Sequence, residues 1–341
     1  MLGAKQLVFR QHDGQFCVMA CKKRTAFVAA VLFLLFSVAC CNAGDAVFSS
    51  DGERVFLISD IESKPAVEEI DLNKKTTRKI LLTQLDRSDS LRGITCTHRN
   101  RFFCTTAKAI WSFEPESGRL TKMRDAPTGV SFWRIAYDPK MQRVFVITDD
   151  RGHPIFTFND PAELIPVRMR RHPYPSSLAF AANGELFFAA YGDLWCGEIR
   201  TDKIDEQDDF SIAAYRCAPL ATLETQNTTP AEIGVADIGV NRDTVYLQLS
   251  RMGGSGDGWF ARLPRPSVKR DTDGGMEMFY QPKERVPIYL KTLHSLEILG
   301  EDSRAGSICV SLDGTRVHYV LHDKHWLVTN GKTEELHLRE Q

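Results

Sequence analysis

The sequence has 341 residues, of which 43% are hydrophobic and 26% are charged, and its formal net charge is −1. This ordinary balance excludes a disordered chain, a collagen-like chain and a protein with many membrane spans. A nearly neutral chain also lacks the clustered basic face that nucleic-acid binding requires. The length allows two domains or one large sheet assembly.

The N-terminal segment 1–43 has the parts of an export signal. An apolar run of 16 residues, 26–41, closely follows three basic residues at 22–24. Because a membrane-spanning helix needs about 20 apolar residues, a cleaved signal peptide is favoured over an uncleaved N-terminal membrane anchor. We expect the true start at Met19 and cleavage after Ala43.

Lipid attachment is a second interpretation of the same segment. Ala39 and Cys40 fit the end of a bacterial lipobox, so Cys40 is a candidate lipidation site, although Ser37 stands where Leu or Val is usual. Removing residues 1–43 takes away a net charge of +4 and leaves the rest of the chain at −5. We therefore expect a mildly acidic exported protein, periplasmic or extracellular, that meets a membrane only through its N-terminal segment or a lipid.

Export would bring the remaining cysteines into an oxidising compartment, where disulfides persist. Cys96 and Cys104 flank a turn symmetrically, and Cys196 and Cys217 bracket a polar insertion. These two pairs are candidate disulfides, and the alternative is that all the cysteines are free and buried. Cys309 lies in an apolar segment and is expected to be a buried small hydrophobic residue. No cysteine or histidine spacing suggests a zinc site.

The rest of the chain repeats one plan, in which a short apolar strand, a polar turn with Asp or Asn, and a stronger apolar strand follow each other. The copies lie at 47–59, 94–106, 135–148, 178–190, 238–250 and 308–321. Most turns carry Asp-Gly, Asn-Gly or Asp-Pro, and the flanks are rich in Val, Ile, Phe and Tyr, which is typical of β-hairpins. Weaker second hairpins follow at 67–80, 110–123, 155–167 and 326–338.

These units predict an all-β fold, a β-propeller of four-stranded blades. A period of about 40–50 residues with four strands is the sequence sign of a propeller blade. Extra loops are expected at 200–212, 224–236 and 267–306. Six blades are favoured, and seven remain an alternative because the last insertion has room for another blade. We expect residues 44–341 to form a single domain in which packing, rather than strand exchange, joins the first and last blades.

The hairpins resemble the WD-like, TolB-type propeller repeat. The matching residues, each followed by an apolar strand, are Ser50-Asp51-Gly52, Asp138-Pro139, Asn183-Gly184 and Leu312-Asp313-Gly314. The likeness covers six blade starts, and it implies an architecture rather than an activity. The Trp-Asp pair that true WD repeats carry at the end of the third strand is absent from this sequence.

Motifs for catalysis, phosphate binding and metal binding are incomplete. Residues 253–257 approach a hydrolase elbow, but Asp replaces the last glycine, and a phosphate loop would need a Gly-Lys-Ser/Thr ending. The histidines at 318, 322 and 325 do not share one face of a strand. The run 271–275 lacks the later acidic positions of a calcium loop. We therefore predict no catalytic residue, no metal site and no cofactor.

The loops that enter the innermost strands ring one mouth of a propeller's central channel, where ligands and partners often bind. Here those loops supply Arg92, Trp133, Arg134, Tyr174, Asp237 and Arg304. Aromatic and arginine side chains are the usual anchors of binding sites, so these six residues are the candidate ligand-binding site. The alternative is that Trp133 packs between blades and that the arginines are solvated.

Three functions fit these observations. The favoured one is an exported, non-enzymatic propeller that binds a protein or a small ligand at the channel mouth. The first alternative is a lactonase-like metal-dependent hydrolase, which would need several inward carboxylates, whereas Asp237 is the clearest one. The second is a carbohydrate-binding envelope module that uses Trp133, Tyr174 and Trp259. Nucleic acid is not an expected partner.

Overall fold

The computed structural model describes residues 46–86, 89–159, 164–169, 174–190, 193–204, 207–218, 222–223, 231–251, 258–265, 297–301 and 307–341. These ranges contain strands and turns, and none of them holds a helix long and apolar enough to cross a membrane. The chain divides after Cys41 into two units, and all described residues belong to the second, 42–341. The export signal and Cys40 lie outside the described residues.

The described strands form five hydrogen-bonded sheets. The first contains β1 (Ala46–Phe48), β2 (Arg54–Ile61), β3 (Lys64–Asp71), β4 (Thr76–Leu81) and β26 (Arg339–Glu340). The second contains β5 (Leu91–Cys96), β6 (Phe102–Thr106), β7 (Ala109–Glu114) and β8 (Arg119–Asp125). A third sheet contains β17 (Thr222–Leu223), β18 (Ala231–Val240), β19 (Thr244–Arg251), β20 (Gly258–Pro264) and β21 (Glu297–Glu301). A fourth contains β22 (Ile308–Val310), β23 (Arg316–Leu321), β24 (Lys324–Thr329) and β25 (Lys332–Leu336).

The remaining sheet has eight strands, which form two antiparallel meanders. The first meander contains β9 (Phe132–Asp138), β10 (Arg143–Thr148), β11 (Ile155–Phe158) and β12 (Ile165–Met169). The second contains β13 (Ser177–Phe180), β14 (Leu186–Ala190), β15 (Asp193–Ile204) and β16 (Gln207–Ala218). Their outer strands β12 and β16 pair in parallel, with Val167 opposite Phe210, and this pairing joins the two meanders.

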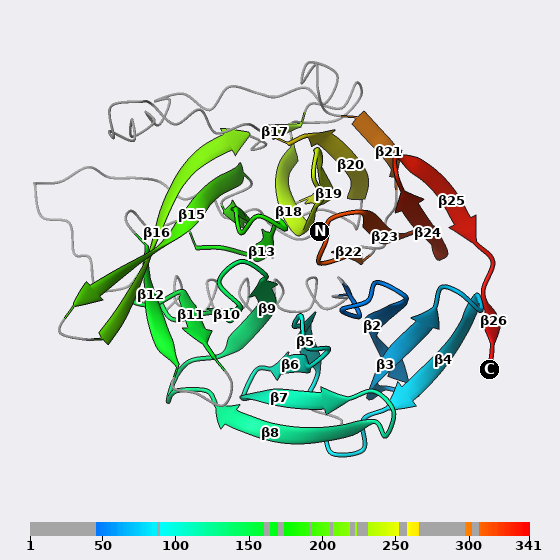
Figure 1. The fold of residues 1–341 in the computed structure, drawn as a ribbon, viewed down its shortest axis with the longest axis horizontal. Helices are drawn as coiled ribbons and strands as arrows, with labels where there is room; N and C mark the ends of the chain where they lie inside the picture. The colour runs from blue at the N-terminus through cyan, green and yellow to red at the C-terminus, as the bar shows by residue number, and fades with distance from the viewer. Residues whose placement is uncertain are drawn as a thin grey trace, which may run out of the picture. The chain divides into compact units, whose positions relative to one another are not determined.

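The sheets stand around a common centre, as Figure 1 shows, so the predicted all-β propeller fold is confirmed. The inner strands β1, β5, β9, β13, β18 and β22 all contribute to the lining of one central cavity. The hydrophobic core lies between neighbouring sheets. Phe56 of the first sheet, for example, meets Phe102 of the second edge to face at 4.6 Å between ring centroids. Each sheet thus buries its faces against its neighbours, as propeller blades must.

The repeated turns are stabilised by their own polar side chains. In the turn 49–54, the Asp51 carboxylate accepts a hydrogen bond from the N–H two residues later at 2.9 Å, and the Ser49 hydroxyl accepts one from the last N–H of the turn at 2.9 Å. The turn 311–316 repeats both bonds at 3.0 and 2.9 Å. The glycine after each Asp has a φ of 73° or 70°, which only glycine adopts without steric cost. The Ser-x-Asp-Gly pattern is therefore a turn signal.

The first and last sheets are joined by strand exchange, so the expectation of packing alone is wrong. After β25 the chain continues to the first sheet, where β26 pairs in parallel with β4. The N–H of Arg339 donates to the carbonyl oxygen of Lys75 at 3.0 Å. Nearer the channel, Arg316 Nη1 donates to the carbonyl oxygen of Gly52 at 2.7 Å. Strand β26 has only two residues, which is too short for a recognisable strand pattern in the sequence.

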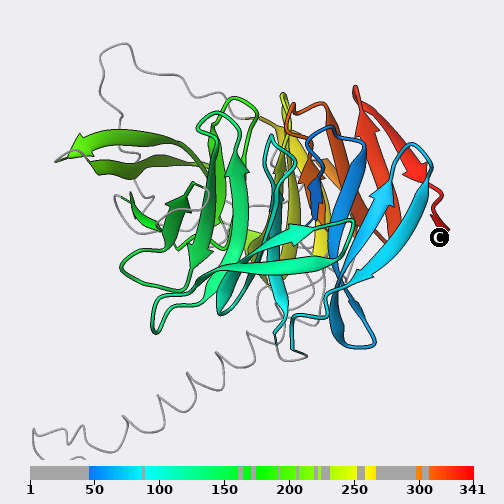
Figure 2. The same ribbon diagram turned by 60° about the horizontal axis from the view of Figure 1, so that its bottom comes forward.

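The polar segment 200–212 extends a hairpin, and the prediction of a loop there is wrong. Strands β15 and β16 have 12 residues each and stay in register from Arg200 opposite Ser211 to Ile204 opposite Gln207. Figure 2 shows this long hairpin extending past the neighbouring strands. Phe210 and Ile212 are 1% and 2% exposed, so they anchor the hairpin in the core. The many polar residues of the segment made it resemble a loop.

Neither predicted disulfide is present in the structure. The cysteines whose side chains are described are all free and buried: Cys96, Cys104, Cys196 and Cys309. The register explains the first failure, because Cys96 lies opposite Phe102 and not opposite Cys104. Cys196 lies opposite Tyr215, and the register shifts before it reaches Cys217. Burial raises the pKa of the Cys96 thiol to about 12, so this thiol is not a reactive thiolate near neutral pH.

Candidate functional site

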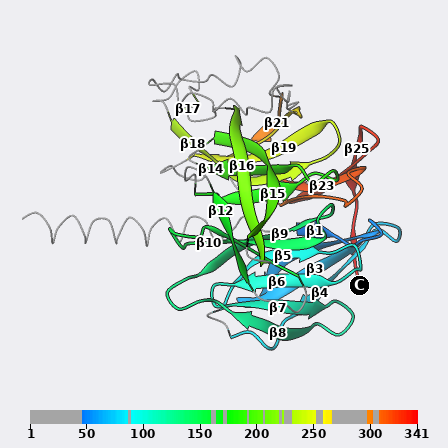
Figure 3. The same cartoon turned by 60° about the vertical axis from the view of Figure 1, so that its left-hand side comes forward.

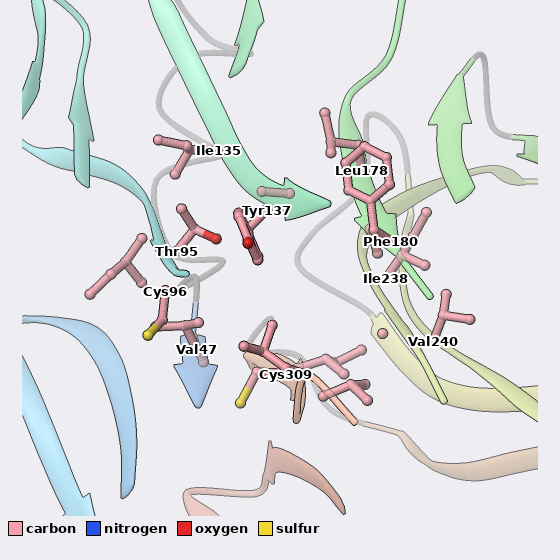
Figure 4. Close-up of a pocket in the computed structure, with 18 of the residues that line it drawn as sticks. Val47, Thr95, Cys96, Ile135, Tyr137, Leu178, Phe180, Ile238, Val240 and Cys309 are labelled. Carbon is pink, nitrogen blue, oxygen red and sulfur yellow. The ribbon is translucent and has the colours of Figure 1, made fainter. Parts of the chain in front are cut away.

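The central cavity is narrow, and most of the residues that line it are apolar. Its volume is about 110 Å³, whereas pockets for small-molecule ligands usually measure about 300–1,000 Å³. Figure 4 shows aliphatic side chains such as Ile135, Leu178 and Val240 around the open centre. Among the described residues that line the cavity, Asp237 is the only acidic one. The channel interior therefore offers little room and, among the described lining residues, one charged side chain for a ligand.

The channel has two different ends. We call the end where the inner strands begin the entry end, and the end with the repeated hairpin turns the turn end. The predicted site residues Arg92, Trp133, Arg134 and Asp237 lie near the start of β5, near the start of β9 and in the middle of the long strand β18. The geometry of the entry end therefore decides how these side chains meet.

Irregular strand pairing determines where most of the predicted residues lie. The register of β5 against β6 shifts around Arg92, and that of β9 against β10 shifts across Trp133 and Arg134. The register of β18 against β19 shifts at Ala236, next to Asp237. An extra residue in one strand turns side chains away from the regular alternation. Three inner strands thus use the same device at corresponding places.

Arg92 and Trp133 form one half of the entry-end site. The Arg92 guanidinium lies over the Trp133 ring at 4.9 Å from its centroid, and Nη1 donates to the carbonyl oxygen of Phe132 at 3.3 Å. The Trp133 carbonyl oxygen accepts a hydrogen bond from the Thr105 hydroxyl at 3.0 Å. Trp133 is half-buried against the core of the eight-stranded sheet. Part of the Trp133 side chain is therefore used for packing inside the protein.

Arg134 and Asp237 form the other half and connect β9 with β18. Arg134 Nη2 donates to the carbonyl oxygen of Ala236 at 3.3 Å. The Asp237 carboxylate accepts hydrogen bonds from the N–H of Ile238 at 3.0 Å and from the N–H of Ile308 at 3.4 Å. Burial raises the pKa of Asp237, and the nearby positive charge of Arg134 opposes that rise. Asp237 is 7% exposed, so its carboxylate mainly holds strands together.

The other predicted residues belong to neither of these two pairs. Tyr174 is 38% exposed, and its hydroxyl donates to the carbonyl oxygen of Arg151 at 3.4 Å. Among the described residues, it is the only exposed large hydrophobic side chain. Arg304 lies outside the described residues. Trp259 is 7% exposed within the core, so the carbohydrate interpretation loses one of its three aromatic residues.

Sequence reasoning missed one polar residue of this region, Gln248. It lies opposite Asp237 in β19, is 1% exposed, and neither atom of its amide has a hydrogen-bond partner. Nothing in the apolar pattern of β19 distinguishes this position from its neighbours. No group of three or more His, Cys, Asp or Glu side chains in the described ranges could hold a metal ion.

Comparisons with known proteins address the fold. No family model matches the sequence, and no curated protein matches it. The chain is similar to the gluconolactonase XC5397 from Xanthomonas campestris, with a TM-score of 0.50 and 12% identity over 85% of this chain and 86% of that one. It is similar to the WD40 repeats of RRP9, with a TM-score of 0.48 and 10% identity over 82% of this chain and 87% of that one. It is also similar to the β-propeller domain of Cps50 (Swd1) from Myceliophteria thermophila, with a TM-score of 0.45 and 10% identity over 86% of this chain and 85% of that one.

At such low identities, these likenesses concern the fold alone. The arrangement of sheets around a channel, together with the repeated hairpins, defines a β-propeller. The propeller architecture that the WD-like repeat implied is thereby confirmed. Its TolB-type detail stays a prediction.

Proposed function

We propose that the protein is an exported, non-enzymatic β-propeller of six blades that binds a partner protein over the entry end of its channel. The blade count treats the eight-stranded sheet as two blades, β9–β12 and β13–β16. Six inner strands that line one cavity support this count. Each of them also starts a run of four antiparallel strands in chain order.

One observation carries the binding proposal. The Arg92–Trp133 stack and the exposed Tyr174 lie at the entry end, above a cavity of about 110 Å³. A channel of this size excludes most organic ligands, so recognition takes place on the surface at its mouth. Arginine, tryptophan and tyrosine are the residues most enriched in the energetic centres of protein interfaces. A protein surface therefore suits this mouth better than a small molecule does.

The alternatives have less support. A lactonase-like hydrolase would gather several carboxylates in the channel, whereas Asp237 is the only acidic side chain among the described lining residues and already accepts two backbone hydrogen bonds. A carbohydrate site would present aromatic faces to solvent. Trp259 is buried, and Arg92 lies over the ring of Trp133.

The test compares two variants of the tagged full chain with the wild type. The mouth variant carries Arg92→Ser and Tyr174→Ser, and the control carries Lys79→Ser on the outer strand β4. After chemical crosslinking in the native extract, mass spectrometry should find a partner with the wild type and the control, and lose it with the mouth variant. Equal capture by all three chains would refute binding at the entry end, and turnover of lactones by the purified chain would refute the non-enzymatic proposal.

Export has its own test. The N-terminal residue of the protein from its natural source, read by mass spectrometry, should be Gly44. A start at a lipid-modified Cys40 would support the anchored form instead. An intact N-terminus on a protein found in the cytoplasm would contradict export.

A further inference from the structure

We propose that the outer edge of β8 is a second docking site, which takes up an extended acidic segment of a partner protein as an additional parallel strand. This inference concerns the rim of the propeller and does not depend on the entry-end site. It rests on the open edge of β8, on two strand additions elsewhere in the same molecule, and on the charge of β8.

The outer edges of the sheets are not alike. Strand β4 is covered by β26, and β12 and β16 cover each other. Strands β8, β21 and β25 lie at the edges of their sheets, with no further strand from the described residues beside them. Figures 1 and 3 show β8 as the outermost strand beyond β7. An edge strand leaves a row of backbone N–H and C=O groups available for another strand.

The molecule itself shows how such an edge is filled. Both outer-edge additions are parallel and short: β26 meets β4 at two positions, and β16 meets β12 at three. Strand β8 offers a comparable stretch, because its pairing with β7 is regular from Arg119 to Lys122 and shifts only beyond Lys122. A parallel segment of three to four residues therefore fits this edge in the same way.

The charge of the edge selects the occupant. Arg119, Lys122 and Arg124 are exposed on β8, and the single acidic residue of the strand, Asp125, pairs with Lys122 at 3.0 Å. An exposed ion pair of this kind contributes little and is easily replaced. The other open edges are acidic, with Glu297 and Glu301 on β21 and with two Glu residues on β25. Opposite charges across neighbouring strands stabilise a pairing, so β8 suits an acidic segment.

The test uses the full chain and three blocked seven-residue peptides as probes. The first alternates Glu and Val, the second alternates Lys and Val, and the third alternates Glu and Pro. The third keeps the charge of the first, but its three prolines fix φ at about −65°, close to the polyproline II value, so its backbone does not follow a neighbouring strand as that of the first peptide does. Fluorescence anisotropy measures binding, and hydrogen exchange with mass spectrometry measures protection of residues 119–125.

Only the Glu-Val peptide should bind and slow amide exchange in 119–125. Arg119 and Lys122 lie on opposite faces of β8, so the Glu side chains of the peptide meet one or the other. The double variant Arg119→Glu/Lys122→Glu should weaken its binding by about tenfold, because the attractive cross-strand pair becomes repulsive on whichever face the Glu residues occupy. The matched control Lys79→Glu/Lys332→Glu, with the same change in net charge, should bind as the wild type does.

Three results would overturn the proposal. Equal binding of the Glu-Pro peptide would mean that charge alone is recognised. Equal weakening by the two double variants would place the peptide elsewhere. Protection of 119–125 that grows with protein concentration in the absence of peptide would assign the edge to a second copy of this chain.

Discussion

Acid should weaken this propeller through one buried histidine at the junction of its first and last sheets. The His318 side chain is fully buried, its Nε2 lies 3.2 Å from His325 Nδ1, and its own Nδ1 has no hydrogen-bond partner. Burial is the main cause that lowers the pKa of His318 to about 3, from the usual value of 6.5, and the nearby His325 adds to it. The other ionisable groups near this pair are Glu68, which raises the pKa of His325, and the buried Cys309 opposite His318.

Whether acid raises or lowers the stability depends on which state, folded or unfolded, binds the proton more readily. Below pH 6.5 the unfolded chain protonates His318 and the folded chain does not, so the stability present above pH 6.5 falls as the pH drops toward 3. Each pH unit in this window costs about 1.4 kcal/mol. At pH 5, the folded state therefore loses about 2 kcal/mol through this group alone.

The variant His318→Leu removes the titrating group and keeps an apolar side chain in the buried site. Relative to the wild type, its free energy of unfolding should improve by about 2 kcal/mol between pH 7.5 and pH 5. Urea titrations followed by tryptophan fluorescence measure this difference. The control His337→Gln changes an 85% exposed histidine and should leave the slope unchanged. Parallel pH profiles for the wild type and His318→Leu would refute the reasoning.

Three further predictions test the packing and the closure of the ring. Gly239→Ala should lower the free energy of unfolding, measured by denaturant titration, by about 1–3 kcal/mol, because the new Cβ would lie 2.5 Å from Ile308 Cγ2. The control Gly152→Ala should change this free energy little, since its Cβ would make only ordinary contacts. Deletion of 339–341 removes the pairing of β26 with β4, including the backbone hydrogen bonds donated by Arg339 and Gln341 and one donated by the Gln341 side chain. It should lower the free energy of unfolding by about 1–4 kcal/mol, and an unchanged midpoint would contradict closure by β26. The four buried cysteines should react with a thiol reagent only after unfolding, and a reducing agent should not change the melting temperature.

The parts of the fold that sequence reasoning predicted are those that depend on local chemistry. An Asp or Asn side chain that bonds the backbone two residues later, as Asp51 and Asp313 do, marks a turn wherever it occurs. Five of the six repeated turns have this bond, and six turns at a propeller period were enough to predict the architecture. The pairing of β26 with β4 depends instead on where the rest of the ring brings two distant segments, and its two residues carry no pattern of their own.

The candidate site shows the same division. Its residues were found because they lie in the loops and first positions of inner strands, but their contacts depend on register. The shifts at Arg92, at Trp133–Arg134 and beside Asp237 are additions of single residues that no apolar alternation reveals. The disulfide prediction for Cys96 failed for a related reason, because symmetry about a turn does not ensure that two residues lie opposite each other.

The contacts at the entry end bear on how a partner would be bound there. Arg92 is held on Trp133 and on a backbone carbonyl, and Arg134 is held on β18. Side chains that are already ordered lose little rotamer freedom on association, so a partner that accepts their geometry gains affinity without that cost. Tyr174 differs, since it is exposed and its hydroxyl lies at a long hydrogen-bond distance, 3.4 Å, from the carbonyl oxygen of Arg151. Substitution of Arg92 should therefore reduce affinity through the loss of a preformed surface, whereas substitution of Tyr174 should reduce it through the loss of contact area alone.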